Sequence, residues 1–86
     1  MKFELGQVMA TSGVRSTLDL NQIVTLVHRH SMGDWGDLCE DDGQLNEDAL
    51  IEGDRILSMY RVHGQKIYVI TEWDRGLTTV MLAEEY

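Results

Sequence analysis

The chain has 86 residues, of which 43 % are hydrophobic and 26 % are charged, a composition typical of one globular domain spanning residues 1–86. Its formal net charge of −8 disfavours direct binding to nucleic acid or to an anionic membrane, because both surfaces are negative. No apolar run approaches the roughly 20 residues that span a bilayer, and a single cysteine, Cys39, excludes an internal disulfide. No apolar segment of the secretory type follows the first residues. These features predict a cytoplasmic protein.

The N-terminal region is predicted to form a strand. Residues Phe3–Thr11 have a composition suited to a β-strand, and Gly6 inside it is a candidate β-bulge. Ser12 and Gly13 follow and are typical of a turn.

The clearest helix signal begins after Asp19. Asp19 and Gln22 have the spacing of a capping box, and Gly33 suits the left-handed position after a helix that ends near Ser31. Four apolar residues at i, i+3, i+4 and i+7 share one face of this helix: Leu20, Ile23, Val24 and Val27. We expect that face to cover a sheet.

A shorter helix is predicted after the glycine-rich loop Gly33–Asp37. Asn46 is placed to cap a helix that continues through Ile51. Leu45 and Leu50 have the spacing of a hydrophobic staple around that cap, and Gly53 can end the helix.

The C-terminal third changes to the two-residue period of strands. Ile56–Val62, Lys66–Trp73 and Leu77–Leu82 are predicted strands, separated by turns at His63–Gln65 and Asp74–Gly76. The predicted fold class is therefore α+β. It consists of an antiparallel sheet of about four strands, the N-terminal strand plus this three-stranded meander, with one main helix and one short helix packed on it.

The negative charge is concentrated in one segment. Nine acids and no Lys or Arg lie between Asp34 and Asp54, whereas outside this segment six acids face seven bases. Such a segment complements a basic protein surface, although an acidic face that only keeps the protein soluble has the same composition. The residues predicted to contact a protein partner are Asp34, Trp35, Asp37, Glu40, Asp41, Asp42, Glu47 and Asp48.

The large side chains of this segment and of the strands allow two interpretations. Trp35, between two glycines, is either a plug that fills the core or an exposed anchor for a partner. The small size of the domain favours the plug, and Trp73 at the end of a strand leaves the same two alternatives open. The flexible methionines are expected to fill gaps in the core: Met9, Met32, Met59 and Met81.

No metal site is predicted from the histidines or the cysteine. His28 and His30 point about 200° apart on a helix and cannot ligate one ion together. As cations at a helix C-terminus they are better explained by the helix dipole. Cys39 and His63 have no partners at zinc-site spacing.

The acidic loop does not fit a calcium loop either. With Gly43 at the sixth position of an EF-hand, Leu38 and Ala49 would stand where carboxylates are needed. No phosphate-binding loop, nucleophile elbow or catalytic triad spacing is present. We therefore expect no catalytic residue, no cofactor and no enzymatic activity.

Several short motifs together resemble a known family. In chain order they are Gly33-Asp34-Trp35-Gly36-Asp37-Leu38, Asn46 with Ala49-Leu50, Arg55-Ile56-Leu57-Ser58-Met59-Tyr60, Ile70-Thr71-Glu72-Trp73-Asp74-Arg75, Thr78-Thr79-Val80 and Glu84-Glu85-Tyr86. The series is similar to small proteins of plasmids, prophages and other mobile elements that are usually labelled plasmid-related proteins. The similarity covers about Leu5 to Tyr86, with departures at Trp73 and in a compressed loop before the first long helix.

The resemblance implies a context rather than an established activity. Small acidic proteins of such elements often antagonise host defence by blocking restriction enzymes or CRISPR effector complexes, and some present carboxylates arranged like DNA phosphates. The leading hypothesis is therefore an inhibitor from a mobile element that binds the basic, nucleic-acid-binding surface of a nuclease or CRISPR complex in the bacterial cytoplasm.

Two alternatives remain. The first is a structural or regulatory protein that forms a homodimer through its sheet, with the strand Leu77–Leu82 as the open edge and a solubilising acidic segment. The second is a small enzyme or metal-dependent module built on the loop around Trp35.

Overall fold

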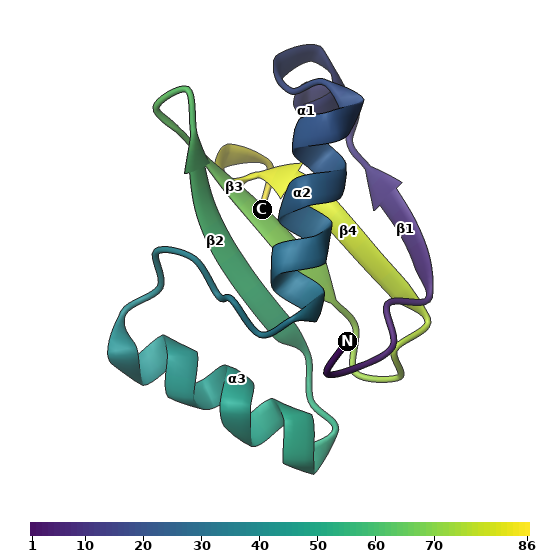
Figure 1. The fold of residues 1–86 in the computed structure, drawn as a ribbon, viewed down its shortest axis with the longest axis vertical. Helices are drawn as coiled ribbons and strands as arrows, with labels where there is room; N and C mark the ends of the chain where they lie inside the picture. The colour runs from purple at the N-terminus through teal and green to yellow at the C-terminus, as the bar shows by residue number, and fades with distance from the viewer.

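A computed structural model describes residues 1–86 as a four-stranded sheet with helices on one of its faces and beside one edge (Figure 1). The strand order is β1-β4-β3-β2. None of the helices has the length and apolar character needed to cross a membrane. In chain order the elements are β1 (Gln7–Ala10), α1 (Ser12–Thr17), α2 (Leu20–Ser31), α3 (Glu40–Glu52), β2 (Ile56–Val62), β3 (Gln65–Thr71), β4 (Leu77–Leu82) and the 3₁₀ turn η1 (Ala83–Glu85).

The predicted α+β class and the C-terminal meander are confirmed. Strands β2, β3 and β4 are antiparallel neighbours, with Ser58 opposite Val69 and Val69 opposite Val80. β1 pairs with β4 in parallel, so the whole sheet is mixed. Because β1 occupies the free side of β4, the last strand of the meander is not an open edge as expected. The two edges of the sheet are β1 and β2.

The predicted bounds of β2 and β4, the first and last strands of the meander, are confirmed, whereas the middle strand β3 is shifted toward the N-terminus. β3 ends at Thr71 rather than Trp73, whose side chain is 68 % exposed. His63 and Gly64 both have positive φ, which is the backbone of a two-residue turn whose twist matches the flanking strands.

Both ends of α2 follow the prediction. The Asp19 side chain accepts a hydrogen bond from the Gln22 amide, and the Gln22 side chain accepts one from the Asp19 amide, which completes the capping box. At the other end Gly33 (φ +84°) and Asp34 donate to the carbonyls of His30 and Arg29. This is the paired bonding of a Schellman motif.

The buried face of α2 differs from the predicted stripe. Leu26, Val27 and His30 face the sheet, whereas Leu20 and Val24 are 74 % and 57 % exposed. β1 is a short edge strand, so the side of α2 that carries Leu20 and Val24 has no further strand to cover. The core itself lies between α1, α2 and the sheet and consists of Val14, Leu18, Leu26, Val27, Tyr60, Ile67, Val69, Val80 and Leu82.

The N-terminal region also departs from the prediction. The strand is limited to Gln7–Ala10, and Gly6 precedes it with φ +65° instead of forming a bulge. A Cβ at Gly6 would lie 2.4 Å from the carbonyl carbon of Gly76, so a close approach of two backbones requires this glycine. Ser12 and Gly13 do not turn the chain but begin α1, which Thr11 caps.

The second predicted helix begins earlier and is longer than expected. α3 starts at Glu40, so Asn46 is a buried interior residue rather than a cap. Leu45 is exposed and forms no staple around it. Glu40 and its two acidic neighbours lie in the first turn, where negative charge stabilises a helix. Gly53 ends α3 in the left-handed conformation, as predicted.

The methionines divide between two environments. Met59 and Met81 are partly covered on the face of the sheet opposite α2, but about half of Met9 and of Met32 is exposed. The expectation that all four fill core gaps is wrong for Met9 and Met32. One belongs to an edge strand, and the other is the C-cap residue that follows the buried His30 and Ser31, so neither is enclosed on all sides.

Candidate protein-binding surface

The loop between α2 and α3 is fastened to the outer edge of β2. The amide of Met59 donates to the carbonyl of Trp35 (3.1 Å), and the amide of Asp37 donates to the carbonyl of Met59 (2.6 Å). Gly36 lies between these bonds at φ +77°, and a Cβ there would lie 2.1 Å from the Met59 carbonyl oxygen. The loop therefore supplies a short strand-like pairing that only glycine permits at this position.

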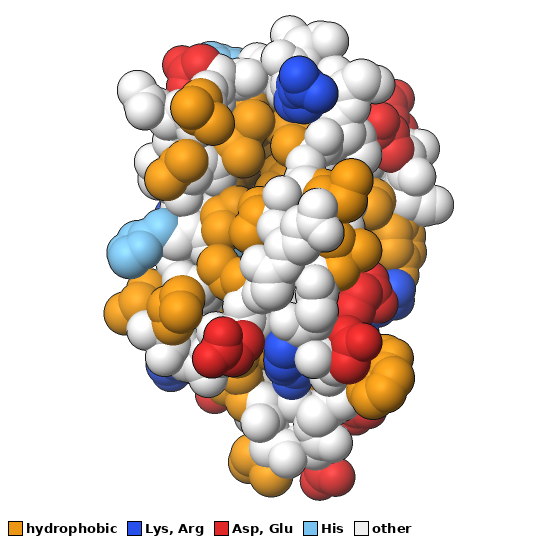
Figure 2. Space-filling model, turned by 90° about the vertical axis from the view of Figure 1, so that its right-hand side faces the viewer, with side chains coloured by type: hydrophobic (Ala, Val, Ile, Leu, Met, Phe, Trp, Pro, Cys, Tyr) orange, Lys and Arg blue, Asp and Glu red, His pale blue; other side chains and the backbone are white.

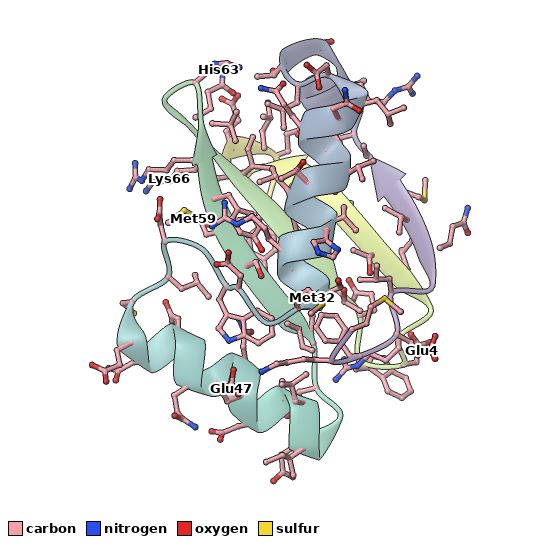
Figure 3. The ribbon with its side chains drawn as sticks, in the orientation of Figure 1. Glu4, Met32, Glu47, Met59, His63 and Lys66 are labelled. Carbon is pink, nitrogen blue, oxygen red and sulfur yellow. The ribbon has the colours of Figure 1, made fainter.

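Trp35 closes the space between this loop, α3 and the N-terminal segment. Its ring stacks on Phe3 at 6.2 Å and meets the edge of His30 at 6.1 Å, measured between ring centroids. The indole Nε1–H donates to Oε2 of Glu47 on α3 (2.8 Å), which lies on the side of the helix facing the loop (Figure 3). These contacts are those of a plug that joins three segments.

Asn46 continues the closure of the same edge. Its side-chain amide donates to the Leu57 carbonyl (2.7 Å) and accepts from the Leu57 amide (3.1 Å), as a neighbouring strand would. The side chain is buried, and its amide replaces water at both backbone groups. The sequence suggested a helix cap here, since nothing local to Asn46 indicates a partner eleven residues later.

Two of the predicted contact acids are neutralised within the molecule. Asp34 Oδ2 lies 2.6 Å from Nε of Arg29, and Asp37 Oδ2 lies 3.4 Å from Nε of Arg61. The hydrogen bond from Arg29 lowers the pKa of Asp34 and raises that of Arg29. Asp34 also accepts from the Gly36 amide, so its carboxylate shapes the loop.

None of the six acids of α3 has a cationic partner, and all of them except Glu47, which accepts from Trp35, point to solvent. Ion pairs form only at Arg29–Asp34 and Arg61–Asp37. Of the eight predicted residues, Asp34, Trp35, Asp37 and Glu47 hold the loop and helix in place, whereas four remain solvent-facing: Glu40, Asp41, Asp42 and Asp48. Asp48 accepts only a hydrogen bond from Gln44 (3.1 Å), one turn earlier on the helix.

The outward side of α3 can be read from its buried side. Asn46 and Ala49 are buried and Gly43 and Leu50 are half-buried. At 100° per residue the side opposite these four residues carries Asp41, Asp48 and Glu52 in one stripe. Ile51 lies beside this stripe and is 83 % exposed. We call Asp41, Gln44, Asp48, Ile51 and Glu52 the α3 acidic face.

A buried hydrogen-bond chain lies behind Trp35. Thr78 Oγ1 donates to the Leu5 carbonyl (2.6 Å), so its one proton is used and Thr71 donates to Thr78 (2.7 Å). Thr71 can then only accept from Nε2 of His30 (2.9 Å), and Nδ1 of His30 accepts from the Ser58 hydroxyl (2.6 Å). The chain therefore places a proton on Nε2 of His30, and Nδ1 accepts from Ser58 when the imidazole is neutral.

Burial and charge keep this histidine neutral. Burial, and secondly the positive charge of Arg75, lower the pKa of His30 to about 4. The predicted role of His30 as a cationic helix cap is therefore wrong, because the side chain turns into the core. No group of three or more His, Cys, Asp or Glu side chains is arranged to hold a metal ion.

Arg75 is a second structural residue that the sequence did not reveal. Its guanidinium donates to the carbonyls of Ala49 (3.0 Å), Asp54 (2.6 Å) and Glu72 (3.1 Å). The end of α3 is thereby joined to the β3–β4 turn, and a cation at a helix C-terminus is favourable. A run of Asp-Arg-Gly indicates only a turn, so this role was not predictable.

A groove of about 430 Å³ lies between the start of α3 and the sheet. Its floor is formed by Leu57, Met59 and Tyr68, and its rim carries both Asp42 and Lys66. The mixed charge of the rim does not select one kind of ligand.

Comparison of the chain with family models, with curated proteins and with solved structures gives no match. The resemblance to plasmid-related proteins therefore stays a prediction.

Proposed function

We propose that this protein is a non-enzymatic inhibitor that binds a basic protein surface through the α3 acidic face. The observation that carries the proposal is the outward stripe of Asp41, Asp48 and Glu52, which no Lys or Arg of the chain neutralises. Ile51, 83 % exposed beside these acids, adds an apolar contact of the kind that contributes to protein interfaces.

The density of charge on α3 supports a target that ordinarily binds nucleic acid. Six acids lie on the 13 residues of α3, which is about one carboxylate per 3 Å of helix axis. One strand of DNA carries a phosphate about every 3.4 Å along its axis. A groove lined with Lys and Arg on the side of the α3 acidic face would meet three of the six carboxylates, Asp41, Asp48 and Glu52, and therefore about half of this linear charge.

The choice of target class comes from the resemblance to proteins of mobile elements. In that context the proposed partner is a nuclease or CRISPR effector complex of the bacterial host, bound in the cytoplasm. Electrostatic steering would make the association fast and sensitive to salt.

The test is affinity capture from bacteria that carry restriction and CRISPR systems, followed by mass spectrometry. The native chain is compared with the triple variant Asp41→Asn, Asp48→Asn and Glu52→Gln. We expect a nuclease or CRISPR subunit with the native chain, at least about tenfold weaker binding by the triple variant, and a Kd that rises between ~50 mM and ~500 mM salt.

A matched pair of single substitutions distinguishes binding through the α3 acidic face from an effect of the net charge alone. Asp48→Asn and Glu84→Gln each remove one exposed negative charge, but Glu84 lies beyond β4 and outside the α3 acidic face. Only Asp48→Asn should weaken the captured complex. Equal capture by the native chain and the triple variant would contradict the proposal.

A further inference from the structure

The outer edge of β1 is open along its whole length. The amides of Gln7 and Thr11 donate toward β4, to the carbonyls of Gly76 and Val80. Because successive residues of a strand point their backbone groups to opposite sides, the N–H and C=O groups of Val8 and Ala10 face away from the sheet. In Figure 1 no element lies beyond β1 on that side.

Apolar side chains flank this open edge on both faces of the sheet. On the helix side, a groove of about 410 Å³ separates β1 from α2 and is lined by Val8, Leu20 and Val24. On the other side Met9 is 51 % exposed. Figure 2 looks onto this edge and shows hydrophobic side chains gathered in its centre.

Apart from its short length, β1 lacks the devices that usually protect an edge strand from pairing. Residues 5–14 contain no charged side chain and no proline, and the positive φ of Gly6 precedes the strand instead of bending it. In a chain of net charge −8 this is also the stretch where another acidic molecule meets the least repulsion.

We infer that β1 pairs antiparallel with β1 of a second copy, about a two-fold axis at Met9 perpendicular to the sheet. In this register Val8 of one copy lies opposite Ala10 of the other, and each pair exchanges both backbone hydrogen bonds. The axis keeps the helix-covered faces on the same side. Leu20 and Val24 of the two copies therefore meet above the joined strands, and the two Met9 side chains meet below them.

The charges at the two ends of β1 select this partner over an unrelated strand. Glu4 precedes the strand at its lower end (Figure 3). At the upper end the strand is followed by α1 (Figure 1), the helix that contains Arg15. A two-fold axis at Met9 exchanges the two ends, which brings Arg15 of each copy toward Glu4 of the other. The edge is thus complementary to itself in charge as well as in hydrogen bonding.

Pairing of the strands alone would form a small interface. A stable interface buries about 800 Å² on each partner, and the groove beside α2 is what extends the contact beyond the four residues of β1. α3 lies at the other edge of the sheet (Figure 1), so this dimer leaves both α3 acidic faces free. The inference does not depend on the proposed inhibitory function.

Sedimentation equilibrium of the full chain from about 1 µM to 1 mM tests the inference. We expect a concentration-dependent dimer, and at least a tenfold higher dimer Kd for the double variant Leu20→Lys and Val24→Lys. Both side chains are largely exposed in the single copy, so this variant should fold and unfold like the native chain, and circular dichroism checks this. A native chain that stays monomeric at every concentration would overturn the inference, as would a dimer that the double variant leaves unchanged.

Charge reversal tests the register. Arg15→Glu alone and Glu4→Arg alone should each raise the dimer Kd about three- to tenfold, and the combined variant should return it to within about twofold of the native value. Failure of the combined variant to recover would overturn the axis at Met9. The triple variant of α3 should dimerise as the native chain does, which keeps this result separate from the test of the proposed function.

Discussion

The outer edges of β2 and β1 present the same difficulty, because each strand leaves every second N–H and C=O without a neighbouring strand. On β2 the backbone groups of Leu57 are bonded by the Asn46 side chain, and those of Met59 are bonded by the loop around Gly36. On β1 the groups of Val8 and Ala10 have no such cover.

The difference lies in what the chain places beside each strand. Next to β2 lie a loop and a helix that supply polar groups, and next to β1 lies a groove with exposed Leu20 and Val24. An edge satisfied from within needs no partner, whereas an edge flanked by apolar side chains gains from one.

Replacing Gly36 by Ala should open the β2 edge with the largest effect. The new Cβ would lie 2.1 Å from the Met59 carbonyl oxygen, and we expect a loss of at least about 3 kcal/mol in the free energy of unfolding, measured with urea. Gly64→Ala is the matched control, because Gly64 has the same φ of +77° but no atom within 4 Å of the Cβ position. It should cost only about 1 kcal/mol. Equal losses would show that the loop does not pair closely with β2.

Acid should weaken the attachment of α2 to β2 and β3. His30 has a pKa of about 4 in the folded chain and an ordinary value near 6.5 when unfolded, so the unfolded state gains the proton first. Stability is therefore highest above pH 6.5 and falls by about 3 kcal/mol as the pH drops from 6.5 to about 4. Urea unfolding at several pH values measures this fall.

The control for the acid effect is His30→Gln, whose side chain can bond Thr71 but does not titrate. Carboxylates give both proteins some pH dependence, so the difference between the two curves isolates His30. Identical slopes between pH 6.5 and pH 4 would contradict the assignment of a buried neutral histidine.

Replacing Asn46 by Ala should weaken the β2 edge more moderately. Both backbone groups of Leu57 lose their partner in a buried site, which should cost about 2 kcal/mol in the free energy of unfolding. Gln44→Ala on the outward side of α3 removes an exposed amide and should change stability by less than about 0.5 kcal/mol. If the two variants were equally stable, Asn46 would not close the edge.

Gly43→Ala should strengthen the helix that lies against the β2 edge. A Cβ at this position would meet only Cδ1 of Trp35, at an ordinary 3.8 Å. Alanine in a helix interior is favoured over glycine by about 0.5–1 kcal/mol. Thermal unfolding should show a higher Tm, and a lower one would mean that α3 packs more tightly on Trp35 than this distance indicates.

Hydrogen exchange compares the two edges without a substitution. The amides of Leu57 and Met59 have partners and should exchange slowly at any protein concentration. Those of Val8 and Ala10 should exchange rapidly in dilute solution and more slowly as the concentration rises. Slow exchange on β1 in dilute solution would contradict an open edge.

The sequence predicted the structure correctly where the conformation of a segment depends only on adjacent residues. The capping box at Asp19, the left-handed glycines at Gly33 and Gly53 and the strands Ile56–Val62 and Leu77–Leu82 were predictable because their signals are carried by adjacent residues. The separation of charge into one acidic segment was equally visible.

The tertiary structure decided what those segments do. Asn46 and His30 were given local roles as caps, yet both bond residues more than ten positions away. Half of the predicted apolar stripe of α2 is exposed, because the sheet does not extend beneath Leu20 and Val24. The sequence shows which side chains of a helix are apolar but not how far the sheet extends beneath them. Likewise, strand order decides which acids form ion pairs and which edge of the sheet stays open. Strand order is itself set by contacts between segments that are distant in the chain.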